Sequence, residues 1–143
     1  MDIDIQELEL KKRYLKRYKK NLALIERLND KVENLTSRIE SIKSPIITDM
    51  PRGGVPVTKE DLVADKLEII ERIDRLKIKG KKYKAEILDI IDELDDTRYA
   101  DILESFFIDC ESLDDIADNM GYTLRHVIRL YSEAIISIDL ECQ

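Results

Sequence analysis

Apolar residues recur at alternating spacings of three and four along two long segments of the chain, with charged residues between them. This heptad pattern is typical of helices that pair along an apolar seam, and it predicts two long helices. Asn21 interrupts the first seam, and Lys66 and Gly80 interrupt the second. Gly80, which costs about 1 kcal/mol relative to alanine, marks either a kink or an interruption tolerated within one helix. The seam residues are Tyr18, Ile25, Leu28, Val32, Leu35, Ile39 and Ile42, then Leu62, Ile69, Ile73, Leu76, Tyr83, Ile87, Ile90 and Leu94.

The connection between the two segments, residues 44–57, contains all three prolines and two of the four glycines, so it cannot be helical throughout. Thr58 followed by Asp61 marks the start of the second helix. Residues 1–94 are therefore predicted to form a long antiparallel helical hairpin resembling a coiled coil. The alternative is that each seam pairs with another chain, and a homodimer of hairpins stays open as well.

Residues 95–143 form the second predicted domain, a small helical one, so the predicted fold class is all-α. A helix over about residues 98–109 would bury its aromatic and branched side chains. A final helix over about residues 124–138 has an apolar stripe, widened by Leu124, Ile128 and Ile135, that is broader than one small domain needs. We expect this stripe to pack against the hairpin or against a second copy of the chain.

Residues 112–130 have the spacing of a helix-turn-helix, the motif that places a helix in the DNA major groove. Ala117 is small enough for two helices to cross closely, and Gly121 falls at the turn, where a positive φ is expected. Val127 points back into the angle between the helices. Ser112 and Thr123 are suited to cap the two helices. The alternative is an ordinary amphipathic helical hairpin.

Charge is distributed unevenly along the chain. The net charge is −7, but residues 95–143 hold twelve acidic residues and three arginines, a balance of −9, which leaves +2 for the rest. Affinity for DNA depends largely on phosphate neutralisation by lysine and arginine. The acidic C-terminal domain therefore argues against strong DNA binding by that domain alone.

The second helix of the motif carries the side chains best suited to contact DNA. Arg125 and Arg129 are four residues apart and share a face, and arginine binds guanine with two hydrogen bonds. His126 and the hydroxyls of Tyr122 and Thr123 suit phosphate or base edges. The alternative is a solvated helix face with no ligand.

Two basic clusters lie in the predicted hairpin. Seven of the ten residues 11–20 are basic and none is acidic. An antiparallel hairpin would bring the clusters together near the helix-turn-helix, as a surface for phosphate groups. Lysines that merely solvate a coiled coil, or a surface for an acidic protein, are the alternatives. The clusters consist of Lys11, Lys12, Arg13, Lys16, Arg17, Lys19 and Lys20, and of Lys77, Lys79, Lys81, Lys82 and Lys84.

No constellation of residues indicates an enzyme, a metal site or a cofactor. Gly53 and Gly54 lack the strand and the Lys-Ser/Thr context of a phosphate-binding loop. A single histidine and the separate Cys110 and Cys142 cannot assemble a catalytic triad or a metal site. The acidic first residues do not resemble a secretion signal, and no segment approaches membrane-spanning length, so we expect a cytoplasmic protein without membrane contacts.

Two stretches resemble region four of bacterial sigma factors: residues 94–103, Leu-Asp-Asp-Thr-Arg-Tyr-Ala-Asp-Ile-Leu, and residues 112–123, Ser-Leu-Asp-Asp-Ile-Ala-Asp-Asn-Met-Gly-Tyr-Thr. The whole chain is similar to small phage and prophage proteins of Gram-positive bacteria, of the kind of the RinA- and ArpU-like late transcriptional regulators. The features shared with them are the long N-terminal helical segment, a loop like residues 49–54, and an ending like residues 120–122 and 129–131.

The resemblance implies a regulator of phage transcription that binds double-stranded promoter DNA together with host RNA polymerase. By position, Thr123, Leu124, Arg125, His126 and Arg129 would lie along the DNA-facing part of a reading helix over residues 123–138. Sigma-type domains usually have a more basic reading helix than this one. The alternative function is therefore a protein-interaction module whose sigma-like domain binds RNA polymerase or another host protein.

Overall fold

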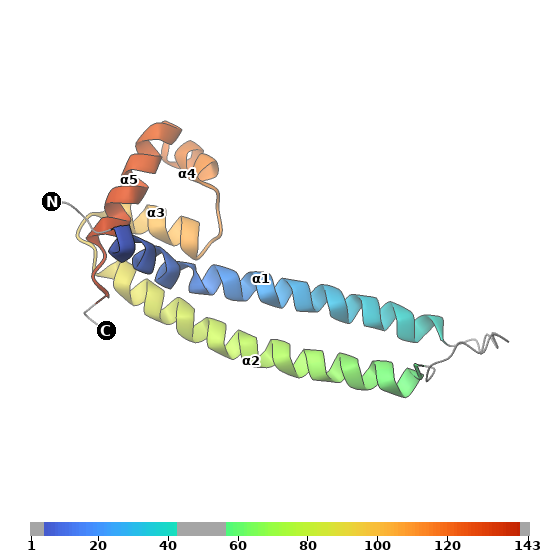
Figure 1. Cartoon of the computed structure of the whole chain (residues 1–143). Coiled ribbons are helices and arrows are strands. Elements are labelled where there is room, and N and C mark those ends of the chain that lie inside the picture. Colours follow the sequence, from blue (N-terminus) through green and yellow to red (C-terminus); the bar gives the residue numbers. More distant parts are fainter. Residues whose placement is uncertain (1–4, 43–56, 141–143) are drawn as a thin grey trace. The chain divides into compact units, whose positions relative to one another are not determined.

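The computed structural model describes residues 5–42 and 57–140 (Figure 1), and these residues form α-helices without any β-strand. The predicted all-α class is therefore confirmed. Most of the predicted proline- and glycine-rich connection lies outside these ranges, as does Cys142. No helix within them combines the length and the apolar composition that crossing a membrane requires. The helices are α1 (Ile5–Ser41), α2 (Lys59–Asp92), α3 (Thr97–Phe107), α4 (Leu113–Met120) and α5 (Leu124–Ser137).

The chain divides into two compact units, and both long helices contribute to each of them. One unit comprises residues 1–22 and 79–143, and the other comprises residues 23–78. The first unit therefore contains the start of α1, the end of α2 and all of α3, α4 and α5. The predicted domain boundary at residue 94 stays a prediction.

Residues 23–78 form a paired-helix unit with an apolar seam. Ile25 and Leu28 of α1 are buried against Ile73 of α2, as the heptad pattern predicted. The start of α2 was also predicted correctly. The backbone N–H of Thr58 donates to the Asp61 carboxylate, and the N–H of Asp61 donates to the Thr58 hydroxyl, both at 3.2 Å. This reciprocal pair satisfies two backbone donors that the first helical turn leaves free.

In the unit of residues 1–22 and 79–143, the two residues that interrupt the apolar seams meet each other. Asn21 is only 6% exposed and lies against Gly80, where a methyl group would overlap the Asn21 amide nitrogen. Helix α2 continues through Gly80 as one helix, so the glycine does not divide this segment into two shorter helices. The glycine therefore makes room for a buried amide. Together with the Arg17–Glu86 ion pair at 2.9 Å, this contact confirms the antiparallel pairing of α1 and α2.

The main core of the same unit joins α1, α2, α3 and α5. Leu15, Ile87, Leu103, Phe107 and Ile135 are each fully buried in it. Burying a side chain of this size contributes about 1.5–3 kcal/mol, so these contacts hold α5 firmly. The expectation that the wide stripe of the last helix packs against the hairpin is therefore confirmed at Ile135.

Leu124 and Ile128, which widen the same stripe at the start of α5, do not join this core. They stay 40% and 45% exposed, so the hairpin does not cover them, and packing of these two residues against a second copy of the chain stays a prediction. The physical reason is their position along the helix. Ile135, seven residues after Ile128, shares its face of α5 but belongs to the core formed with α1 and α2, which includes buried residues only from the C-terminal half of α5. The N-terminal half packs against α3 and α4 through Val127, on the neighbouring face.

Candidate nucleic-acid interface

The turn between α4 and α5 has the geometry that the sequence predicted. Gly121 has φ 72° and ψ 28°, in the left-handed region that glycine adopts without steric cost. Its N–H and that of Tyr122 donate to carbonyls of the last turn of α4. The hydroxyl of Ser112 accepts from the Asp115 N–H at 3.1 Å, and that of Thr123 accepts from the His126 N–H at 3.2 Å. Both predicted caps are therefore confirmed.

A small apolar cluster beneath the turn fixes the angle between α4 and α5. Ala117 is 3% exposed and Val127 is fully buried, and both pack with Ile102 of α3. Ile116 and Leu130 complete the cluster. Because these side chains point inward, the opposite side of α5 faces outward and is free to contact a ligand.

The outward side of α5 combines cationic and apolar side chains. Arg125 is exposed and makes no hydrogen bond or ion pair with any residue of the described ranges. Arg129 is exposed by 69% of its side chain. Leu124 and Ile128 lie beside these arginines, and Thr123, Arg125, His126, Ile128 and Arg129 together line a shallow surface depression.

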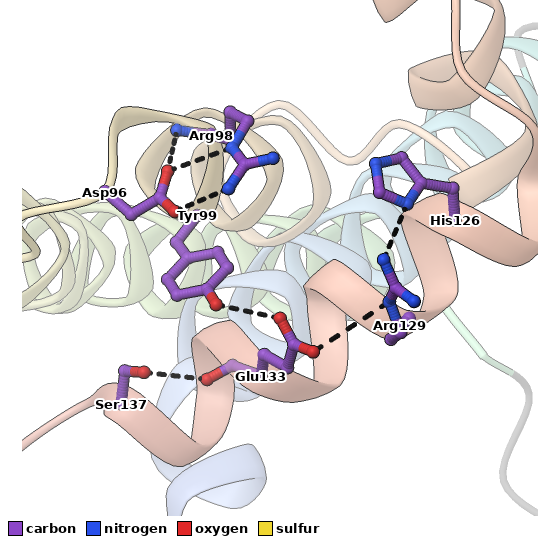
Figure 2. A network of polar contacts seen from close by, with 7 residues as sticks. All are labelled: Asp96, Arg98, Tyr99, His126, Arg129, Glu133 and Ser137. Carbon is purple, nitrogen blue, oxygen red and sulfur yellow. Dashed lines mark hydrogen bonds and ion pairs between the residues drawn. The ribbon is translucent and has the colours of Figure 1, made fainter.

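A chain of polar contacts holds Arg129 in place (Figure 2). Its guanidinium lies 3.9 Å from the Glu133 carboxylate on one side and 3.3 Å from Nδ1 of His126 on the other. Arginine only donates, so this contact requires that Nδ1 of His126 accept the hydrogen bond. The Tyr99 hydroxyl of α3 donates to Glu133 at 2.8 Å. That hydrogen bond is the main cause of the raised pKa of Tyr99.

The third arginine of the C-terminal region, Arg98, has a local partner. Its backbone N–H and its guanidinium both donate to the Asp96 carboxylate, which caps α3. The side-chain hydrogen bond between Arg98 and Asp96 is the first cause both of the raised pKa of Arg98 and of the lowered pKa of Asp96. Arg98 is therefore paired with a carboxylate, whereas Arg125 has no such partner among the described residues.

The structure separates the first basic cluster into engaged and exposed members. Lys11 is 8% exposed and donates to the carbonyl of Ile136 at 2.9 Å, so it joins α1 to α5. Arg17 pairs with Glu86 and stacks on two tyrosine rings, and the Lys19 ammonium lies 3.8 Å from the centre of the Phe106 ring. These three side chains stabilise packing, a role that sequence reasoning missed.

The remaining members of the first cluster form an exposed stripe on α1. Arg13, Lys16 and Lys20 follow one another at spacings of three and four, so they share one face of the helix, with Lys12 beside it. None of them pairs with a residue of the described ranges. We call Arg13, Lys16 and Lys20 the α1 basic stripe.

The second basic cluster is exposed along α2, and it belongs to both compact units. Lys79, Lys81, Lys82 and Lys84 lie in the same unit as α5, whereas Lys77 lies in the unit of residues 23–78. The Lys84 ammonium lies 6.0 Å from the centre of the Tyr18 ring of α1. The pairing of the two helices therefore brings parts of both clusters side by side, as expected.

The exposed face of α4 is acidic, because Asp114, Asp115 and Asp118 all point into solvent. Glu133 of α5 is only partly exposed, and it contacts Tyr99 and Arg129. Over residues 5–42 and 57–140, no three histidine, cysteine or acidic side chains gather in a way that could hold a metal ion.

The chain matches the model of a known protein family. The matching family model is described as a protein of unknown function (DUF1492), and it covers residues 39–139, which include all of α2, α3, α4 and α5. No curated protein and no solved structure matches the chain. Because the family model covers more than two thirds of the 143 residues, the chain belongs to the DUF1492 family.

Proposed function

We propose that this protein is a DNA-binding transcriptional regulator of phage or prophage genes, which reads promoter DNA with α5 and acts with host RNA polymerase in the bacterial cytoplasm. The observation that carries the proposal is the exposed face of α5, where Arg125 and Arg129 follow a glycine turn of helix-turn-helix geometry. The resemblance to phage regulators and to sigma region four supplies the biological setting. The proposal includes no catalytic activity and no cofactor.

In this proposal the N-terminal half of α5 enters the major groove. Arg125 is the main base-reading residue, because its guanidinium is unpaired and suits the O6 and N7 atoms of guanine. Arg129 is a second reader, with an orientation fixed by Glu133 and His126. The hydroxyls of Tyr122 and Thr123 lie at the start of α5, where contacts to phosphate usually occur.

In this proposal, the residues that bind phosphate lie largely outside the helix-turn-helix, because the exposed acidic side chains of α4 repel DNA. The α1 basic stripe belongs to the same compact unit as α5 and carries three uncompensated charges. Each phosphate contact releases counterions and makes binding depend on salt. We therefore assign general affinity to the α1 basic stripe and sequence preference to α5.

The test is salt-titrated binding of the purified protein to fragments tiling the genome that encodes it. Under the proposal, one fragment is retained well above the rest and its affinity falls steeply with salt. Replacing Arg125 and Arg129 with alanine should abolish this preference, whereas replacing the α1 basic stripe with glutamine should weaken binding to every fragment and flatten the salt slope. A control with the same loss of charge replaces the exposed Arg27, Lys31 and Lys59 of the other unit. Uniformly weak binding to all fragments would overturn the proposal.

A second candidate is a protein-interaction module that binds RNA polymerase or another host protein without reading DNA. The exposed carboxylates of Asp114, Asp115 and Asp118 favour it, because they suit a basic protein surface better than a phosphate backbone. Under this candidate, replacing these three residues with asparagine weakens co-purification with polymerase. Under the DNA-reading proposal, the same variant binds DNA more tightly because repulsion is removed.

A further inference from the structure

The first two turns of α5 expose apolar side chains that are not part of the buried core. Leu124 and Ile128 are 40% and 45% exposed, whereas Val127 and Leu130 of the same helix are buried. Being four residues apart, the two exposed side chains lie above one another on one face. Burial of either against a ligand would be favourable, because water would leave its apolar surface.

This apolar surface is continuous with the cationic one. Ile128 is adjacent in sequence to Arg129 and three residues from Arg125, and these three side chains line the same shallow depression. The ligand of such a face must offer an apolar group close to strong hydrogen-bond acceptors. The charge of the two arginines favours an anionic ligand, and DNA is both anionic and able to present such groups together.

The major groove presents one apolar group on its base edges, the 5-methyl group of thymine, and guanine presents two acceptors there. We propose, on the premise that α5 reads DNA as described above, that Leu124 and Ile128 recognise thymine by contact with this methyl group. Arg125 or Arg129 binds a guanine beside it. The site read by α5 is therefore a duplex sequence in which thymine and guanine are close neighbours.

The spacing of the two side chains limits the length of the sequence read. Four residues of helix correspond to a rise of about 6 Å, and successive base pairs are about 3.4 Å apart. Leu124 and Ile128 therefore span about two base pairs. Ile128 is branched at Cβ and loses little freedom on binding, so we expect it to contribute more than Leu124.

The experiment begins with selection of binding sites from random duplex DNA by the full chain. Each thymine of the selected sequence is then replaced singly by deoxyuridine, which removes the methyl group and leaves the pairing edge unchanged. The expected loss of affinity is about fourfold at one or two positions, equivalent to about 0.8 kcal/mol for one buried carbon. Leu124→Ala or Ile128→Ala should abolish the difference between thymine and deoxyuridine at the matching position.

Ile136→Ala is the matched control, because Ile136 is 39% exposed on the same helix two turns further on. This variant should keep the full difference between thymine and deoxyuridine. All three replaced side chains are exposed, and melting temperatures of the variants would verify that their fold is intact.

The possible outcomes separate this inference from the proposed function. A selected sequence at which no thymine is sensitive to deoxyuridine overturns the inference and leaves DNA reading by α5 intact. A methyl effect that persists in both Leu124→Ala and Ile128→Ala assigns the contact to another residue and also overturns it. Failure of the selection to enrich any sequence overturns the proposed function, and the inference with it.

Discussion

The contact between Asn21 and Gly80 allows a prediction in which one substitution has opposite effects in two backgrounds. In the parent protein, Gly80→Ala gains about 1 kcal/mol from helix propensity. The new methyl group would overlap the buried Asn21 amide, and overpacking of this kind costs about 1–3 kcal/mol. We therefore expect Gly80→Ala to leave the parent no more stable, and to destabilise it by up to about 2 kcal/mol.

In a background of Asn21→Ala the same substitution should stabilise the protein. The amide is then absent, and the next atom near the new methyl group is Cε1 of Tyr18 at 3.9 Å, an ordinary contact distance. Gly80→Ala should gain about 1 kcal/mol in this background. The difference between the two backgrounds, about 1–3 kcal/mol, is the coupling energy between the two positions.

Urea unfolding followed by near-ultraviolet circular dichroism suits this measurement. The chain contains no tryptophan, and its tyrosines all lie in the unit of residues 1–22 and 79–143, so the signal reports on the unit that contains the contact. Ala85→Gly, at an exposed position of α2 in the same unit, calibrates the effect of helix propensity. Equal stabilisation by Gly80→Ala in both backgrounds would refute the packing argument.

Three further predictions concern the unit that contains α5. Gly121→Ala should lower the free energy of unfolding by about 1 kcal/mol through backbone strain. Strain is the only cause, since nothing lies within 4 Å of the added methyl group. An unchanged midpoint of urea unfolding would contradict this. Lys11→Met keeps the buried aliphatic stem but removes the ammonium group that donates to the Ile136 carbonyl. We expect the free energy of unfolding, measured by thermal unfolding, to fall by about 1.5–3 kcal/mol. Lys12→Met is the control and should be nearly neutral. Tyr99 has a raised pKa in the folded state, so loss of its hydroxyl proton destabilises the fold. The stability that Tyr99 contributes is complete below the unfolded pKa of 10.0 and is lost as the pH rises through the pKa of the folded state. Tyr99→Phe should therefore flatten the alkaline decline of the melting temperature, and an identical decline in both proteins would show that Tyr99 is not responsible.

The helix-turn-helix was predictable from sequence because its determinants are local. Ser112, Gly121 and Thr123 act within one turn of their own positions, through caps and a left-handed backbone conformation. The heptad seams likewise depend on a periodicity that can be counted along the chain. Predicting such features does not require knowing which other helix packs against them.

The roles of the basic residues were not predictable in the same way. Nothing in residues 11–20 distinguishes Lys11, which is buried against a carbonyl of α5, from Lys16, which is exposed. That distinction depends on contacts between positions more than one hundred residues apart. Asn21 and Gly80 were each recognised as an interruption, but their meeting requires the register between α1 and α2.

The exposure of Ile128 could not be predicted from the spacing of apolar residues either. Its spacing fits the buried stripe of the last helix as well as that of Ile135 does, and the two residues differ only in whether the core formed with α1, α2 and α3 reaches them. An exposed isoleucine beside two arginines was therefore classed as packing, although it belongs to the face that we propose reads DNA.

The hydrogen bond from Lys11 to Ile136 affects how the chain can fold while it is being synthesised. It joins positions 125 residues apart, so α1 leaves the ribosome long before its buried partner in α5 is synthesised. Residues 23–78 lie between the two segments of this unit, and their pairing shortens the loop that must close. During translation, the core that Leu15 and Ile87 share with Ile135 stays incomplete until α5 emerges, a period in which chaperones or neighbouring chains would meet apolar surface.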